Sequence, residues 1–446
     1  MVLLVILLLL SVVFLIVSTN TLNLHPFLAL LFAALGFGLF AGMPLPDIIA
    51  SVNEGFGSTL GYIGILIVTG TIIGTFLEHS GGAFALAERI IKAIGDKHIP
   101  LAMSIIGYIV SIPVYADSGF VILSPLNRAL SKKAKITLAA TAIALSLGLT
   151  AAHTLVPPTP GPIAAAGILE ADLGLVILFA IPVSLFAMML GWFCATRLGK
   201  RIQIDPNPDL TSAEIDAKLD QAPPAWKSLL PILIPILLIV TKSISEFPTN
   251  PVGEGFWQAF FIFIGDPVIA LLIGVLLAFT LPRVFEKEML SSDGWVGQGL
   301  VNAAIIILIT GAGGAFGKVL QNSGIADVIG ESLSGANLGI WLPFILAAAI
   351  KTAQGSSTVA IITTASLVAP LLPSLGFETA VAKAFVVLAI GAGSMVASHA
   401  NDSFFWVVTQ MSDMDVRTGY KLHSLGTLIM GIGTAGFLWV LSWFAL

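Results

Sequence analysis

Charged residues are scarce in this sequence, at 10% of 446 residues, whereas a soluble domain carries roughly 25%. Water cannot solvate a surface so poor in charge, and we therefore expect most of the exterior to face lipid. Cysteine is nearly absent as well: Cys194 is the single one, which excludes a disulfide framework and a cysteine-based metal cluster. The net charge of −5 and the lack of a basic stripe give no sign of a nucleic-acid partner, and none is expected.

Long apolar runs are what the sequence has in abundance. Examples are Val2–Val17, Phe27–Phe40, Leu229–Val240 and Val268–Leu281. A helix that spans a bilayer needs about 20 mainly apolar residues. The first run lacks a basic leading region and a small-residue cleavage site, so we interpret it as a retained spanning helix and not as a signal peptide. The sequence thus predicts an all-α integral membrane protein with the lipid bilayer as its surroundings.

One long polar stretch, at 199–227, divides the apolar sequence into two halves. Arg197, Lys200 and Arg201 stand at its start and predict that it lies in the cytoplasm, because basic loops stay on that side. We therefore expect a first membrane repeat at 1–198, a cytoplasmic linker at 199–227 and a second membrane repeat at 228–446.

Basic clusters around Arg89 and Lys132 place both ends of the segment between them in the cytoplasm. The segment is too short for two spans, and Pro113 and Gly119 break its middle. We expect a re-entrant helical hairpin at about 98–131, followed by a broken helix at about 136–168. The second half is expected to hold a hairpin at about 340–373, entering from the outside, and a broken helix at about 380–411.

The second half repeats motifs of the first half weakly, in the same order and at nearly constant spacing. The motif Gly70-x3-Gly74 returns as Gly313-x3-Gly317, and Ala152-His153 returns as Ser398-His399. About five spans and one hairpin per half make the number of crossings odd, so the second repeat should be inverted. Inverted repeats with helices broken at the midplane are typical of secondary transporters.

Four polar breaks interrupt the apolar segments, and we expect them to form one substrate pocket. The N-terminal ends of half-helices carry unpaired N–H groups and partial positive charge, so they bind carboxylates without an arginine. The candidate substrate-binding residues are Asp117, Ser118, Gly119, His153, Pro157, Pro158, Thr159, Gly355, Ser356, Ser357, Thr358, His399, Asn401, Asp402 and Ser403. No catalytic residue, metal site or cofactor is expected.

Asp117, His153 and Asp402 are the candidates for proton coupling. A carboxylate in hydrocarbon is costly and therefore functional by default, and one that loads and releases a proton couples transport to a proton gradient. Histidine titrates near neutral pH and could share that proton. The plainer interpretation is that the two acids cap helix turns and that the histidine packs in a core.

Other polar features have less specific interpretations. Lys351 either attracts an anion or extends towards the surface. The run Gly311–Lys318 imitates a phosphate-binding loop, but Val319 stands where Ser or Thr would bind magnesium, and close helix packing explains the glycines better. Four histidines at predicted span ends are interpreted as interface residues: His25, His79, His98 and His423.

Several motifs carry a resemblance to a known family. A histidine followed by V-P-P, P-G-P and an alanine run stands at His153–Gly167, and G-A-G-G-A-F stands at Gly311–Phe316. Gly355–Ala360 resembles a G-S-A-T-V-A motif, and Asp402–Trp406 resembles D-S-x-F-W. These motifs are similar to those of the gluconate permease family, which are gluconate:proton symporters with a D-serine permease among them. The resemblance covers nearly the whole chain.

The resemblance implies proton-coupled import of a small organic anion across the bacterial inner membrane. The wider ion transporter superfamily implies a homodimer with a moving transport domain. Two positions depart from the family: Asp117 stands where Glu is usual, and Thr159 stands where gluconate carriers usually have His. These departures leave open a substrate other than gluconate, such as the shorter acid glycerate.

Our leading hypothesis is therefore secondary active import of a small hydroxy-carboxylate, gluconate or a related sugar acid, by proton symport. A sodium-coupled organic-anion carrier is the alternative, since Ser, Thr, Asn and unwound carbonyl groups also suit that ion. From other classes come an intramembrane enzyme that uses Asp117 and Asp402 as an acid pair, and a passive channel.

Overall fold

The computed structural model describes residues 2–22, 24–95, 98–206, 220–246, 253–325, 338–400 and 402–445. Helices make up the regular structure in these ranges, which confirms the expected all-α class. Large apolar side chains remain well exposed, among them Leu9 at 61%, Phe263 at 63% and Trp443 at 66%. An exterior of this kind suits lipid, where backbone polar groups are satisfied inside helices.

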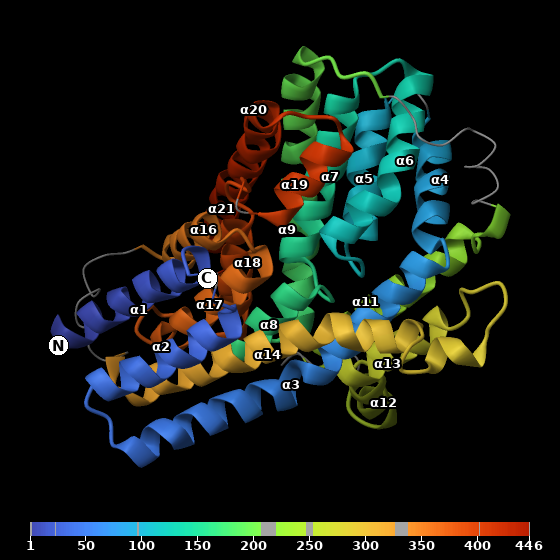
Figure 1. The fold of residues 1–446 in the computed structure, drawn as a ribbon. Coiled ribbons are helices and arrows are strands. Elements are labelled where there is room, and N and C mark those ends of the chain that lie inside the picture. Colours follow the sequence, from blue (N-terminus) through green and yellow to red (C-terminus); the bar gives the residue numbers. More distant parts are fainter. Residues whose placement is uncertain are drawn as a thin grey trace.

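Two long helices, α3 (Leu45–His79) and α14 (Trp295–Asn322), lie side by side along one edge of the molecule (Figure 1). Their backbones meet at Gly55 and Gly314: a Cβ on Gly55 would lie 2.4 Å from the Gly314 carbonyl oxygen. Small residues permit such an approach between membrane helices. The contact confirms that the glycines of Gly311–Lys318 serve helix packing.

Shorter helices flank this pair. They are α1 (Val2–Asn20), α2 (Pro26–Phe40), α4 (Gly82–Ile94), α11 (Ala225–Ser245), α12 (Phe256–Ile264), α13 (Pro267–Ala278) and the 3₁₀ turn η3 (Lys287–Leu290). Helices α12 and α13 meet at an angle of 64°. Asp266 caps the start of α13 by accepting a hydrogen bond from the Val268 N–H at 3.1 Å.

A bundle of helices stands beside this layer and fills the middle and upper part of Figure 1. From the first half it contains α5 (Ile99–Val110), α6 (Ala116–Ala134), α7 (Leu138–Leu155), α8 (Pro160–Ile168), α9 (Leu173–Leu198) and η2 (Gly199–Arg201). From the second half it contains α16 (Trp341–Gln354), α17 (Ser357–Val368), η4 (Ala369–Leu371), α18 (Ala380–Ser394), α19 (Ser403–Met411), α20 (Val416–Gly419), η5 (Tyr420–Ser424) and α21 (Leu425–Ala445). The segment α7–α8 lies at the centre, almost wholly enclosed by protein.

Four breaks divide helices of this bundle, between α5 and α6, α7 and α8, α16 and α17, and α18 and α19. Pro113 lies in the first break and Pro157 in the second, and proline cannot continue a helix. In the third, Gly355 has a φ of 86°, a left-handed conformation that favours glycine. In the fourth, Ala397 has a φ of 50°. Three of the four predicted polar stretches therefore contain a break between half-helices. Asp117 and Gly119 instead lie inside α6, so the expectation that Gly119 breaks this segment is wrong.

Within the described ranges, five helices are long and apolar enough to cross a membrane, and up to seven if each of two bent pairs is one span. The shorter apolar helices include the halves α5, α17 and α18. The two inverted repeats, the linker at 199–227 and its cytoplasmic side stay predictions.

Candidate functional site

Residues at three of the four breaks, together with Thr150 and His153 of α7, line one cavity of about 130 Å³. Seven of the predicted substrate-binding residues line it: Asp117, His153, Ser356, Ser357, Thr358, Asp402 and Ser403. The remaining lining residues are Tyr115, Ala116, Thr150, Lys351, Met395, Ser398 and Phe404. Residues distant in the sequence thus meet around a single cavity.

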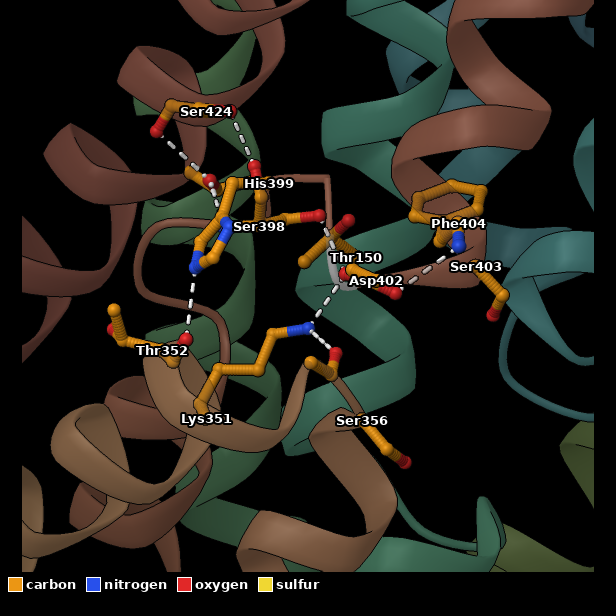
Figure 2. A network of polar contacts seen from close by, with 12 residues as sticks. Thr150, Lys351, Thr352, Ser356, Ser398, His399, Asp402, Ser403, Phe404 and Ser424 are labelled. Atoms are coloured by element: carbon orange, nitrogen blue, oxygen red, sulfur yellow. Dashed lines mark hydrogen bonds and ion pairs between the residues drawn. The ribbon is translucent and has the colours of Figure 1, made fainter. Parts of the chain in front are cut away.

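A buried ion pair stands at one side of this cavity (Figure 2). The Lys351 Nζ lies 2.5 Å from the Asp402 Oδ2, and the two side chains are only 1% and 9% exposed. Lys351 also donates to the Gly355 carbonyl oxygen at the tip between α16 and α17. The lysine therefore does not extend to the surface. Its ammonium group lies inside the protein.

Asp402 is both a helix cap and an ion-pair partner. Its Oδ1 accepts a hydrogen bond from the Phe404 N–H at 3.0 Å, which caps the start of α19. Its Oδ2 accepts a hydrogen bond from the Ser398 hydroxyl at 2.5 Å, beside the contact with Lys351 (Figure 2). Buried charges need such pairing to offset the loss of hydration.

Asp117 lies in the first turn of α6. Its Oδ2 accepts a hydrogen bond from the Ser403 hydroxyl at 3.2 Å, and Ser403 is the first residue of α19. Further along α6, Arg128 donates to the carbonyl oxygen of Met411, the last residue of α19, and to Asp413 Oδ2, the latter at 2.8 Å. Both ends of α19 are therefore tied to α6.

His153 and Tyr115 bring unsatisfied polar atoms to the cavity wall. Among the described residues, neither the His153 Nδ1 nor the Tyr115 hydroxyl has a hydrogen-bond partner, although both atoms are buried. The two rings lie 6.2 Å apart, centroid to centroid. Buried polar atoms are rarely left without a partner, so these two are available to a bound molecule.

His423 was interpreted as an interface residue, and the structure shows that interpretation to be wrong. Its side chain is fully buried, and its Nε2 lies 3.0 Å from the Ser398 Oγ. Its Nδ1 lies 3.3 Å from the Ser146 Oγ of α7. The histidine thus continues the hydrogen-bonded chain that begins at Lys351 and Asp402.

The other predicted residues lie around the cavity without lining it: Ser118, Gly119, Pro157, Pro158, Thr159, Gly355 and His399. The Thr159 hydroxyl donates to the Val156 carbonyl oxygen at 2.5 Å. The His399 Nε2 lies 2.8 Å from the Thr352 carbonyl oxygen, away from the Lys351–Asp402 pair in Figure 2. Asn401 falls outside the described residues.

The predicted set omitted several lining residues. Thr150 lies on the same face of α7 as His153, three residues earlier, and that spacing could have indicated it. Ser398 stands next to His399 in the fourth polar stretch, and its hydroxyl could have indicated it. Tyr115, Met395 and Phe404 have no distinguishing signal in the sequence. Within the described part of the chain, no group of three His, Cys, Asp or Glu side chains could hold a metal ion.

Apolar helices broken beside a cavity that buried charged and hydroxyl side chains line are typical of a multi-pass membrane transporter. Residues 2–444 match the family described as GntP family permease, and the chain belongs to this family. Its relatives are permeases, so the protein is a transporter and not an enzyme.

Two relatives and one solved structure illustrate the similarity. The chain is 34% identical to a gluconate permease of Pseudomonas aeruginosa, over 97% of this chain and 96% of that protein. It is 35% identical to the inner membrane permease YgbN of Escherichia coli, over 93% of both chains. The structure of MtrF from Neisseria gonorrhoeae aligns with a TM-score of 0.68, covering 95% of this chain and 96% of that one. At 16% identity, MtrF supports the fold alone.

Proposed function

We propose that this transporter imports a small hydroxy-carboxylate, gluconate or a related acid such as glycerate, by proton symport across a bacterial inner membrane. One observation carries the proposal: the cavity is lined by a buried ammonium group, Lys351, which is paired with Asp402, and by a second carboxylate, Asp117. The relatives named gluconate permease and inner membrane permease support the substrate class and the membrane.

The cavity suits an acid with several hydroxyl groups. Lys351 supplies positive charge for the substrate carboxylate, and Ser356, Ser357 and Thr358 form the start of α17, where N–H groups and the helix dipole attract an anion. Thr150, Ser398 and the unpartnered His153 and Tyr115 supply hydrogen-bonding groups for hydroxyls. A volume of about 130 Å³ favours a small substrate.

Proton coupling follows from the charges around this cavity. An anionic substrate that approaches Lys351 competes with Asp402 for the ammonium group and meets a second negative charge at Asp117. Like charges at close range in a medium of low polarity repel strongly. Binding is therefore favoured when a proton neutralises a carboxylate. We assign that proton to Asp117, which forms no ion pair with another described residue, with His153 and Asp402 as the other groups able to share it.

The test is uptake into proteoliposomes of labelled gluconate, glycerate, D-serine and citrate, with and without an inward proton gradient. We expect gradient-dependent accumulation of one hydroxy-acid in the absence of sodium. Accumulation only with a sodium gradient would instead establish a sodium-coupled carrier. Equilibration without accumulation would indicate a channel, and a converted product would indicate an enzyme. The homodimer implied by the resemblance is also a proposal, and a mass measurement in native nanodiscs would test it.

A further inference from the structure

His423 is a buried histidine that the proposed coupling does not use. It lies in a single π-helical turn, Tyr420–Ser424, just before α21. Such turns insert one extra residue into a helix and are frequent at functional sites. Here the turn and the start of α21 bring His423, Ser424 and Thr427 against one residue of the neighbouring break, Ser398.

Each polar group of Ser398 is held by this segment. The Ser398 N–H donates to the Thr427 Oγ1 at 3.1 Å, and the Ser424 hydroxyl donates to the Ser398 carbonyl oxygen (Figure 2). The Ser398 Oγ lies 3.0 Å from the His423 Nε2. Ser398 is thus fixed from the side opposite the cavity.

The number of hydrogen atoms on each side chain determines which atom donates in this series of hydrogen bonds. A serine hydroxyl carries one hydrogen, and Ser398 places it on the Asp402 Oδ2 at 2.5 Å. The contact with His423 therefore has the Nε2–H as donor and the Ser398 Oγ as acceptor. The His423 Nδ1 then carries no hydrogen and lies 3.3 Å from the Ser146 Oγ, whose hydroxyl also reaches the Ile143 carbonyl oxygen at 3.0 Å. Hydrogen bonds run from His423 through Ser398 to Asp402, where they meet the Lys351 ammonium group.

We propose that His423 is a positioning residue of the substrate site. Through Ser398 it orients the Asp402 carboxylate, and Asp402 in turn holds the Lys351 Nζ where the substrate carboxylate binds. His423 does not line the cavity, so it acts on substrate affinity without touching the substrate. This inference rests on the proposed function, because it requires an anion at Lys351.

Two variants of His423 separate positioning from other roles. His423→Gln keeps an N–H donor in reach of Ser398, whereas His423→Leu removes the donor at similar volume. Uptake of labelled gluconate, glycerate and citrate into proteoliposomes is measured over a range of concentrations. We expect His423→Leu to raise KM about tenfold and to change the maximal rate by less than about twofold, as for the loss of one hydrogen bond. His423→Gln should restore KM to within about threefold of the wild type.

Several results overturn the proposal. An unchanged KM in His423→Leu, with or without lower thermal stability, means that the imidazole does not position the site. If the variants His423→Gln and His423→Leu both abolish proton-driven accumulation while substrate exchange persists, the imidazole carries a proton instead.

A double-mutant cycle with Ser398→Ala tests the proposed path. His423→Leu should raise KM no further when Ser398 is already alanine. Thermal unfolding of the wild type, both single variants and the double variant tests the same coupling without substrate. If the double variant loses less stability than the two single variants together, the contact is supported. If the losses of stability add up, the contact is overturned. If the wild type takes up none of the three acids, the proposed function fails, whereas the unfolding cycle still decides whether His423 acts through Ser398.

Discussion

Asp402 illustrates how much one side chain contributes to this site. One carboxylate oxygen caps α19, and the other receives the Ser398 hydroxyl and the Lys351 ammonium group. Because Lys351 is 1% exposed, neither charge of the pair can be solvated by water if its partner is lost. The stability of the bundle and the charge of the substrate site therefore depend on the same contact.

Removing Lys351 should consequently cost more stability than removing an exposed partner. We expect Lys351→Met to lower the free energy of unfolding by about 3–5 kcal/mol, because it leaves the Asp402 carboxylate buried and unpaired. Lys242→Met is the matched control: the Lys242–Asp266 side chains are 22% and 43% exposed, so its loss should cost about 0–1 kcal/mol. Thermal unfolding of both purified variants measures the difference, and equal losses would contradict the burial argument.

Asp117→Asn tests which carboxylate carries the proton. The amide keeps the size of the side chain and cannot be protonated, so we expect proton-driven accumulation to be lost while exchange of substrate across the membrane continues. Glu88→Gln is the control, since Glu88 forms an exposed pair with Lys92 on α4 and should leave accumulation unchanged. Normal accumulation by Asp117→Asn would remove this residue from the coupling step.

The sequence allowed some of these residues to be identified and not others. Asp117, His153 and Asp402 could be predicted because polar groups stand out beside helix breakers in apolar segments. The role of Lys351 could not, because it depends on Asp402, which lies 51 positions away in the chain. His423 was missed because a π-turn decides which way it faces. Thr159 was expected in the pocket, but its hydroxyl is bonded to the backbone of Val156.

At the scale of helices, proline and glycine mark the first three breaks, which is why polar tips could be located there from the sequence, whereas the fourth break contains neither residue. The pairing of α6 with α19 could not be, because Ser403–Asp117 and Arg128–Asp413 are contacts between remote segments. These contacts tie both ends of α19 to α6. We infer that α6 and α19 behave as one rigid unit.

The contact between α3 and α14 gives a prediction at the same scale. A Cβ on Gly314 would lie 2.0 Å from the Thr59 Oγ1 and 2.6 Å from the Gly55 carbonyl oxygen. Gly314→Ala should therefore push the helices apart and cost about 1–3 kcal/mol of stability. Gly36→Ala on α2 is the control, because a Cβ there has no described atom within 4 Å. Denaturation curves of the two variants should differ, and similar curves would mean that the helices can separate at no cost.

Across the whole molecule, the cavity combines both halves of the chain. The first half supplies Asp117 and His153, and the second supplies Lys351 and Asp402. The α3–α14 layer lies to one side of the bundle that carries these residues (Figure 1). If the repeats are inverted, as the sequence predicts, the tips of the two hairpins approach the cavity from opposite sides of the membrane.

Cysteine labelling tests this topology. In a Cys194→Ser background, Lys132→Cys places a thiol at the exposed end of α6, and Ser374→Cys places one after η4. We expect a membrane-impermeant maleimide added to intact cells to label position 374 and not position 132. Inverted vesicles should give the reverse pattern, and labelling of both positions from one side would rule out the inverted arrangement.

The two halves do not contribute equivalent groups to the cavity, and this asymmetry has a consequence for the handedness of the substrate. The Lys351 ammonium group, the His153 imidazole and the hydroxyls at the start of α17 are three different partners in fixed positions. The two mirror-image forms of an acid place their carboxylate and hydroxyl groups differently relative to these three partners. The transporter should therefore distinguish D-glycerate from L-glycerate, although the two molecules have the same charge, size and solubility.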